Sequence, residues 1–259
     1  MNQAPIMYTD VPGFEKCQDI FKLWIEHKEF DYSPEQQAAM MSDQNESVAV
    51  PDFFTPDEFA ELTSYFLKDP VWHLFWEGGS SLLNINPDVP NYKRIMELTV
   101  DRMRDMHGYF HLDNLFVRKA LNSLELHSDN VYNFAGRTPK KTYCIPLAVE
   151  RNGTYSDDWS NVGTVVMNQF QYSRSYGGDI FNVIGDTGKE FDDTEYELMS
   201  HIPKEQLHGL SIQEYLPWHQ REVLMFDSYR IHSSSDWSKH GVDAKWCLVV
   251  QSSIDTPSS

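Results

Sequence analysis

The sequence predicts an α+β fold in which helices come first and the strands of a β-sandwich or barrel follow. Apolar positions repeat at helical spacing in several segments of the first 108 residues. From residue 109 onward the chain contains short apolar or alternating runs rich in β-branched and aromatic residues. A chain of 259 residues that is 41% hydrophobic and 14% aromatic can bury a sizeable core. We found no internal repeat or low-complexity linker, so we expect a single domain over residues 1–259.

The chain divides into three regions along this domain. Residues 1–47 are expected to form an N-terminal helical extension, because the segment 13–45 carries a broad apolar face. Residues 48–108 are expected to supply one strand, within SVAVPDFF, and two helices. Residues 109–254 are expected to form the β core, with a polar insertion at about 173–215.

The two helices expected before the core have clear start and stop signals. Thr55 can cap the first helix, with Pro56 in its first turn and Glu58 at the position of a capping-box partner. The second helix covers NYKRIMELTVDRMRDMHG and is expected to end at Gly108.

Charge and cysteine content exclude several classes of protein. A formal net charge of -18 argues against generic DNA or RNA binding, which needs clustered Lys and Arg. No run approaches the roughly 20 apolar residues of a membrane span, and the start of the chain does not resemble a signal peptide. Cys17, Cys144 and Cys247 form no CxxC pair, and the last two lie in strand-like runs typical of buried thiols. We therefore expect a reduced, cytoplasmic protein.

Two His-x-Asp pairs are candidates for metal binding. In SLELHSD, strand alternation would place Glu125, His127 and Asp129 on one face, so that the histidine and the aspartate could chelate one ion. The same spacing occurs at His111 and Asp113, in YFHLDN. The spacing alone is weak evidence, because most such pairs are hydrogen-bonded or solvated.

Two downstream residues favour the pair at His127 and Asp129. His232 follows the strand-like run EVLMFDSYR and would complete a triad of two histidines and one carboxylate, which leaves open positions on Fe(II). Lys245 stands near the start of the apolar run AKWCLVVQSS, where a buried ammonium needs an anionic partner. A metal site built on His111 and Asp113 would need its own distal partner, and their strand precedes the one that carries His127. We therefore expect them to be a supporting or edge-strand pair.

With these motifs the sequence resembles the Fe(II)/2-oxoglutarate-dependent oxygenases, in particular their prolyl-hydroxylase-like branch with a lysine anchor. ELHSDN, KKTYCIPLAV, TVVMNQF, REVLMFDSYRIHSSS and KWCLVVQSS follow in the family's order, so the resemblance covers roughly residues 48–254. It implies a double-stranded β-helix (jelly-roll) core with supporting N-terminal helices. It also implies that His127, Asp129 and His232 bind iron and that Lys245 binds the far carboxylate of 2-oxoglutarate. By the same resemblance, a hydroxyl from Tyr143 would assist Lys245.

The resemblance implies a dioxygenase that uses Fe(II), 2-oxoglutarate and O2, releases succinate and CO2, and hydroxylates an unactivated C–H bond. The substrate would be a small molecule or an amino-acid side chain, and nucleic acid is disfavoured by the charge. Two alternatives remain open: a cupin-like metal enzyme that does not use 2-oxoglutarate, and a catalytically silent β-barrel binding module. Tyr132, Trp159 and Trp237 either shape the substrate pocket or pack in the core. The sequence does not determine the oligomeric state.

Overall fold

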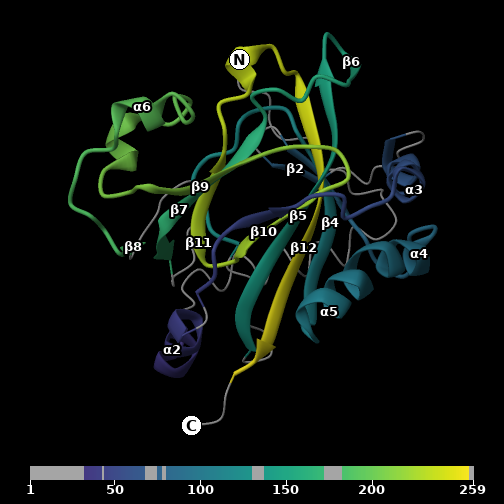
Figure 1. Cartoon of the computed structure of the whole chain (residues 1–259), viewed down its shortest axis with the longest axis horizontal. Helices are drawn as coiled ribbons and strands as arrows, with labels where there is room; N and C mark the ends of the chain where they lie inside the picture. The colour runs from purple at the N-terminus through teal and green to yellow at the C-terminus, as the bar shows by residue number, and fades with distance from the viewer. Residues whose placement is uncertain are drawn as a thin grey trace.

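The chain forms two antiparallel β-sheets that face each other, with helices on the outside (Figure 1). The structure is a computed structural model that describes residues 32–42, 44–67, 75–77, 80–129, 137–171 and 183–256. Side chains from both sheets meet in one buried apolar cluster, which includes Cys144, Val166, Trp218 and Val249. This arrangement confirms the mainly β, jelly-roll core that the sequence resemblance implied.

Within the described residues, the larger sheet contains eight strands. In spatial order they are β1 (Val48–Val50), β10 (Val223–Asp227), β5 (Arg137–Arg151), β12 (Ala244–Asp255), β4 (His111–Ala120), β3 (Ser80–Asn84) and β2 (Phe75–Glu77), with β6 (Thr154–Ser156) beside β5. The smaller sheet contains β11 (Arg230–Ser234), β7 (Gly163–Gln171) and β8 (Val183–Ile184), with β9 (Ile212–Pro217) beside β7. Strands β5 and β12 pair along almost their whole length and form the centre of the larger sheet.

Helices cover the outer face of the larger sheet. These are α3 (Pro56–Leu67), α4 (Tyr92–Met96), the π-helical turn η1 (Glu97–Asp101) and α5 (Arg102–His107). Their apolar side chains pack in one cluster with outward-facing residues of β4, β5 and β12. The expected capping box is present: the Thr55 amide donates to Glu58 Oε2 at 2.8 Å, and the Glu58 amide donates to Thr55 Oγ1 at 3.3 Å. Gly108 ends the last helix with a φ of 79°.

The described part of the expected N-terminal helix is α2 (Pro34–Ser42). It docks at the edge of the core, where Tyr229 donates its hydroxyl proton to the Met40 carbonyl oxygen at 2.6 Å. The earlier part of the predicted segment, before residue 32, lies outside the described residues.

The polar segment predicted as an insertion contains more regular structure than its composition suggests. Its described part includes β8, α6 (Asp193–Tyr196), the 3-10 turn η2 (Lys204–Leu207) and the first residues of β9. Apolar side chains such as Phe191, Met199 and Leu207 pack against Val165 and Ile231 of the smaller sheet. The insertion therefore covers the outer face of this sheet, on the side of the molecule opposite α3–α5 (Figure 1).

The strand expected at SLELHSD, residues 123–129, is not formed as a continuous strand. Strand β4 ends at Ala120, and the following segment pairs with the smaller sheet at one position only, the bridge between His127 and His232. The alternation argument was therefore wrong about the local structure, although it placed His127 and Asp129 correctly on one side.

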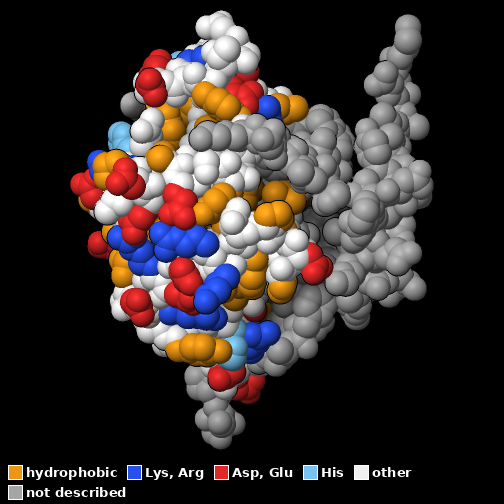
Figure 2. Space-filling model, turned by 90° about the vertical axis from the view of Figure 1, so that its right-hand side faces the viewer, with side chains coloured by type: hydrophobic (Ala, Val, Ile, Leu, Met, Phe, Trp, Pro, Cys, Tyr) orange, Lys and Arg blue, Asp and Glu red, His pale blue; other side chains and the backbone are white. Residues whose placement is uncertain are grey.

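The helical face of the molecule carries mixed charges. Figure 2 shows basic and acidic side chains side by side on the described part of this face, and Arg94–Glu61 and Arg102–Glu58 are ion pairs there. No helix within the described ranges is long and apolar enough to cross a membrane. The last short helix, η3 (Ser238–His240), connects β11 to β12.

Candidate active site

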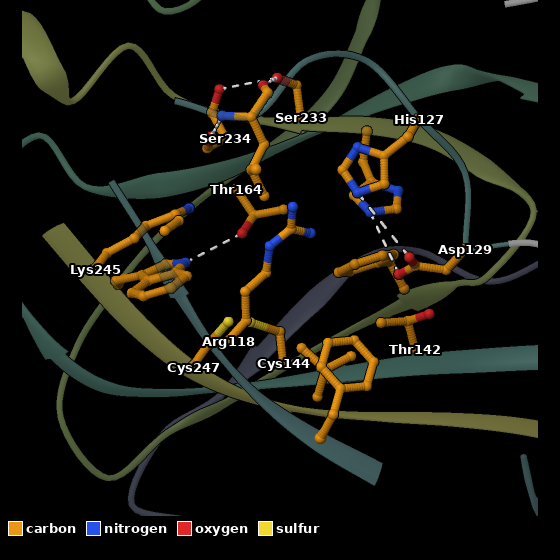
Figure 3. Close-up of a pocket in the computed structure, with 17 residues that line it drawn as sticks. Arg118, His127, Asp129, Thr142, Cys144, Thr164, Ser233, Ser234, Lys245 and Cys247 are labelled. Carbon is orange, nitrogen blue, oxygen red and sulfur yellow. Dashed lines mark hydrogen bonds and ion pairs between the residues drawn. The ribbon is translucent and has the colours of Figure 1, made fainter. Parts of the chain in front are cut away.

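A cavity of about 530 Å³, open mouth included, lies between the two sheets. Its lining residues come from both sheets and from the segment that follows β4 (Figure 3). Figure 3 shows His127 and Asp129 towards one end and Lys245 towards the other. His232 lies with His127 and Asp129, and Trp218 lies beside Lys245. The remaining lining residues are Phe116, Arg118, Ala120, Leu124, Thr142, Cys144, Thr164, Phe226, Ser233, Ser234, Cys247 and Val249.

The structure brings the three expected metal ligands together. One ligand atom from each of His127, Asp129 and His232 lies within 4.8 Å of the other two. Asp129 Oδ2 is 3.4 Å from His232 Nε2, and Asp129 Oδ1 is 4.0 Å from His127 Nε2. Within the described part of the chain, this is the group of three such residues with metal-binding spacing.

Backbone hydrogen bonds hold the two histidine segments against each other. The His127 amide donates to the His232 carbonyl oxygen at 3.0 Å, and the His232 amide donates to the His127 carbonyl oxygen at 2.8 Å. Ser233 and Ser234 bind the same segment, because their hydroxyl oxygens contact the carbonyl oxygen and the amide of Leu124. The polar run after His232 in the sequence therefore fastens the His-x-Asp segment to β11.

Each histidine presents the same nitrogen to the cavity. His127 Nδ1 bonds the Glu125 carbonyl oxygen at 2.8 Å, and His232 Nδ1 bonds the Arg230 carbonyl oxygen at 3.0 Å. A carbonyl oxygen only accepts, so Nδ1 carries the proton and Nε2 keeps its lone pair towards Asp129. This tautomer is the one that a metal-binding histidine needs.

Electrostatics also favour the metal-binding form of these side chains. Burial, together with neighbouring His232, lowers the pKa of His127 to about 3, so its imidazole is neutral at pH 7. Burial by itself would raise the pKa of the Asp129 carboxyl. The attraction of the carboxylate to the adjacent His232 has the larger effect and holds this pKa below its ordinary value. Neutral imidazoles and an ionised carboxylate are the forms that bind a divalent metal.

Lys245 lies where the sequence argument required a buried cation. It is 3% exposed, and its Nζ lies 4.3 Å from the ring centroid of Trp218. Burial lowers the pKa of Lys245 to about 8. No described carboxylate lies within ion-pair distance of its ammonium, so the cavity offers an anion a buried partner.

The structure does not bring Tyr143 to the cavity, and this corrects the expected role of its hydroxyl. Strand alternation in β5 turns Thr142 and Cys144 towards the cavity and Tyr143 towards the opposite face. There its ring stacks on Phe110 at a centroid distance of 5.6 Å. The Tyr143 side chain therefore faces away from the cavity, on the side of the sheet that the helices cover.

The other candidates also have clear positions. Trp237 is fully buried and Trp159 is partly buried, and both pack in the core without lining the cavity. Tyr132 lies outside the described residues. Cys144 and Cys247 are free and buried, as expected, and both line the cavity.

Sequence reasoning missed five polar lining residues: Arg118 on β4, Thr142 on β5, Thr164 on β7, and Ser233 and Ser234 on β11. One signal was available for Arg118. Alternation along FVRKA places it on the same face as Phe116 and opposite Lys119, so one of these two cations must face inward.

Comparison with known proteins supports the fold assignment. No family model matches the sequence, and no curated protein matches it. Among solved structures, the non-heme alpha ketoglutarate dependent epimerase SnoN from nogalamycin biosynthesis matches with a TM-score of 0.50 and 11% identity, over 85% of this chain and 83% of SnoN. EctD from S. alaskensis, in a structure with 2-oxoglutarate and 5-hydroxyectoine, matches with a TM-score of 0.50 and 16% identity, over 88% of this chain and 79% of EctD.

These similarities define the class of fold. The chain has the fold of the Fe(II)/2-oxoglutarate-dependent oxygenases, as its sequence resemblance implied. At such low identity the similarity establishes the fold alone. The residues of this chain therefore have to indicate its function.

Proposed function

We propose that this protein is an Fe(II)- and 2-oxoglutarate-dependent oxygenase that hydroxylates a small molecule or an amino-acid side chain. The observation that carries the proposal is the position of a His127–Asp129–His232 triad and the buried Lys245 in one cavity. A metal triad alone fits many chemistries, whereas a buried cation in the same cavity adds a site for an anionic cosubstrate.

The donor set fits Fe(II). The two Nε2 atoms and one carboxylate oxygen would hold the ion and leave three coordination positions open. Both histidines are oriented by carbonyl partners, and the Phe226 ring packs against His232 at a centroid distance of 4.5 Å. Such outer contacts fix ring orientation and limit access of water to the ligands.

Lys245 would bind the far carboxylate of 2-oxoglutarate and so orient the cosubstrate towards the triad. When bound, the metal and the cosubstrate supply the oxidative chemistry, in which O2 is consumed and 2-oxoglutarate yields succinate and CO2. The protein contributes the open coordination sites, the anion anchor and the apolar walls of the cavity. Hydroxylation is the outcome that we propose, and EctD, with 5-hydroxyectoine in its structure, is compatible with it.

The test is anaerobic binding of Fe(II) and 2-oxoglutarate. We expect a weak visible metal-to-ligand charge-transfer band when both are present, and its loss in His232→Ala. Succinate release would then be measured in the presence of small metabolites, amino acids and peptides. A compound that increases the rate of succinate release is a candidate substrate.

Different outcomes separate the alternatives. Metal binding without 2-oxoglutarate binding would support a cupin-like metal enzyme and contradict the proposal. Absence of both would favour a silent binding module. If a substrate is consumed with succinate release but gains no oxygen atom, the oxygenase class stands and the proposal of hydroxylation is wrong.

A further inference from the structure

The register between β7 and β11, which lie side by side in Figure 1, shifts immediately before the metal ligand His232. Arg230 lies opposite Phe170, whereas His232, two residues later, lies opposite Val166, four residues earlier on β7. Strand β7 therefore contains a bulge at residues 167–169. A bulge bends its strand and changes the direction in which nearby side chains point, and bulges are common beside active sites.

The guanidinium of Arg230 binds the main chain of this bulge. Its Nη1 donates to the carbonyl oxygens of Met167 and Asn168, each at 3.3 Å. Its Cζ lies 4.4 Å from the centroid of the Phe170 ring, and the whole residue is buried. A bulge leaves main-chain groups without their usual partners in the sheet, so a buried donor at this place stabilises it.

A buried carboxylate neutralises this arginine. Asp227 Oδ2 lies 3.4 Å from Arg230 Nε. The same carboxylate pairs with Lys141 of β5 and accepts from the Asn45 amide at 3.2 Å. A buried guanidinium needs such a partner, because an unpaired charge in the interior is costly. Asp227 thus joins the end of β10 to β5 and to the start of β11.

The insertion holds the bulge from a second side. The Asn168 amide donates to the Ser211 carbonyl oxygen at 2.9 Å, and the Ser211 amide donates to Gln169 Oε1 at 2.9 Å. The Gln169 amide group also donates to the Gly185 carbonyl oxygen at 3.0 Å. The bulge therefore has partners in the insertion as well as in Arg230.

Arg230 also contacts the metal ligand through its main chain. His232 Nδ1 donates to the Arg230 carbonyl oxygen at 3.0 Å, and His232 Nε2 lies 3.4 Å from Asp129 Oδ2. One residue thus binds the bulge with its side chain and the imidazole with its carbonyl oxygen. A movement of residue 230 relative to β7 would turn the His232 ring, and such outer partners fix the orientation of metal-binding histidines.

From these contacts we infer that Arg230 is a positioning residue for His232: it holds the bulge of β7 and so directs Nε2 of His232 towards the metal. The inference rests on the proposed function and deepens it, because Arg230 belongs neither to the triad nor to the lining of the cavity. A lysine in its place would keep the charge beside Asp227 but not the planar fork of donors. A methionine would lose both.

The experiment measures metal binding by the full chain without O2, with Fe(II) for the affinity and Co(II) as a spectroscopic probe. In Arg230→Met we expect Fe(II) to bind about 10- to 100-fold more weakly, as for loss of an outer partner of a metal ligand. The visible absorption bands of bound Co(II), which depend on ligand geometry, should shift. Arg230→Lys should restore part of the affinity. If Arg230→Met does not fold, Arg230→Lys is the test, with weaker Fe(II) binding and shifted Co(II) bands expected.

Arg104→Met is the matched control. The Arg104 guanidinium also donates to a main-chain carbonyl oxygen, that of Phe110, at 3.2 and 3.0 Å. Its Cζ lies 5.3 Å from the centroid of the Phe110 ring. Arg104 belongs to α5 on the helical face and does not line the cavity. Its loss should lower the midpoint of thermal unfolding without changing the Fe(II) affinity or the Co(II) bands.

The outcomes separate this inference from the proposed function. If the unmodified protein does not bind Fe(II), the proposed function fails and the inference fails with it. If Arg230→Met binds Fe(II) as tightly as the unmodified protein, the positioning role is wrong and the proposed function stands. A weaker Fe(II) affinity with unchanged Co(II) bands would also overturn the inference, because the ligand geometry would be intact. An equal loss of Fe(II) affinity in Arg104→Met would do the same, because general destabilisation would then explain both.

Discussion

The two His-x-Asp pairs of this chain have the same spacing and different surroundings. His111 and Asp113 lie in the first part of β4, which pairs with β12, whereas the pairing of β4 with β3 covers Phe116 to Ala120. Their side chains contact the same sheet: His111 Nε2 lies 3.0 Å from Asp255 Oδ1, and Asp113 Oδ1 accepts from Ser253 at 2.9 Å.

His127 and Asp129 lie in a segment that has left β4 and crosses to the smaller sheet. That crossing places them beside His232 of β11, which supplies the third ligand. The spacing places two side chains together, whereas a metal site also needs a ligand from a second element. The following experiments test this contrast.

Loss of a triad ligand should have the largest effect. We expect His127→Ala to weaken Fe(II) binding by on the order of 100-fold or more. Removal of a residue that only hydrogen-bonds to a metal ligand already lowers the metal affinity about 10- to 100-fold. The matched variant His111→Ala should leave the affinity unchanged. Titration of both variants with Fe(II) under anaerobic conditions measures this, and equal effects of the two would refute the contrast between the pairs.

Lys245 should affect the cosubstrate without affecting the metal. In Lys245→Met we expect 2-oxoglutarate affinity to fall about 10- to 100-fold, since a charged hydrogen bond is lost, while Fe(II) affinity stays the same. Isothermal titration calorimetry with 2-oxoglutarate and with Fe(II) compares these affinities between Lys245→Met and the unmodified protein. A parallel loss of Fe(II) binding would mean that Lys245 supports the triad instead.

The pH dependence of cosubstrate binding should follow Lys245. Burial lowers its pKa to about 8 in the free protein, so below pH 8 the ammonium is already charged and ready for a carboxylate. Above pH 8, binding must include uptake of a proton, and 2-oxoglutarate affinity should fall about 10-fold per pH unit. Lys245→Arg, which stays charged, should flatten this profile; an unchanged profile would exclude Lys245 as its origin.

The smallest effect is expected at Asp113. Burial raises the pKa of this carboxyl, so the folded protein binds its proton more tightly than the unfolded chain does. Its contribution to the free energy of unfolding is therefore greatest at low pH and declines as pH rises past the ordinary value of 3.8.

Asp113→Asn should accordingly change the free energy of unfolding at pH 7 by less than about 1 kcal/mol. As pH rises, the variant should become more stable relative to the unmodified protein. Denaturant titrations at several pH values measure this. A change in Fe(II) affinity in this variant would contradict the supporting role of the pair.

Much of the fold could be predicted because its signals are local. Thr55, Glu58 and Gly108 mark helix ends through hydrogen bonds and backbone angles that involve only near neighbours in sequence. The strand runs that include β5, β7, β10 and β12 were recognisable because each is apolar and rich in β-branched or aromatic residues. The segment at 123–129 was wrongly predicted as a strand. It forms a single bridge to the smaller sheet, and one bridge can orient side chains as a strand does.

The sequence by itself determined the chemistry that is available: two histidines, one aspartate and one lysine in an order typical of a known class of oxygenases. It also determined the sheet-forming runs that hold them. The tertiary structure decided which face of β5 lines the cavity and that Arg118 and Lys245 line the same cavity, and it brought the predicted His-x-Asp pair to His232. These contacts join residues far apart in the chain, and strand pairing and the crossing between sheets, rather than local preference, bring them together.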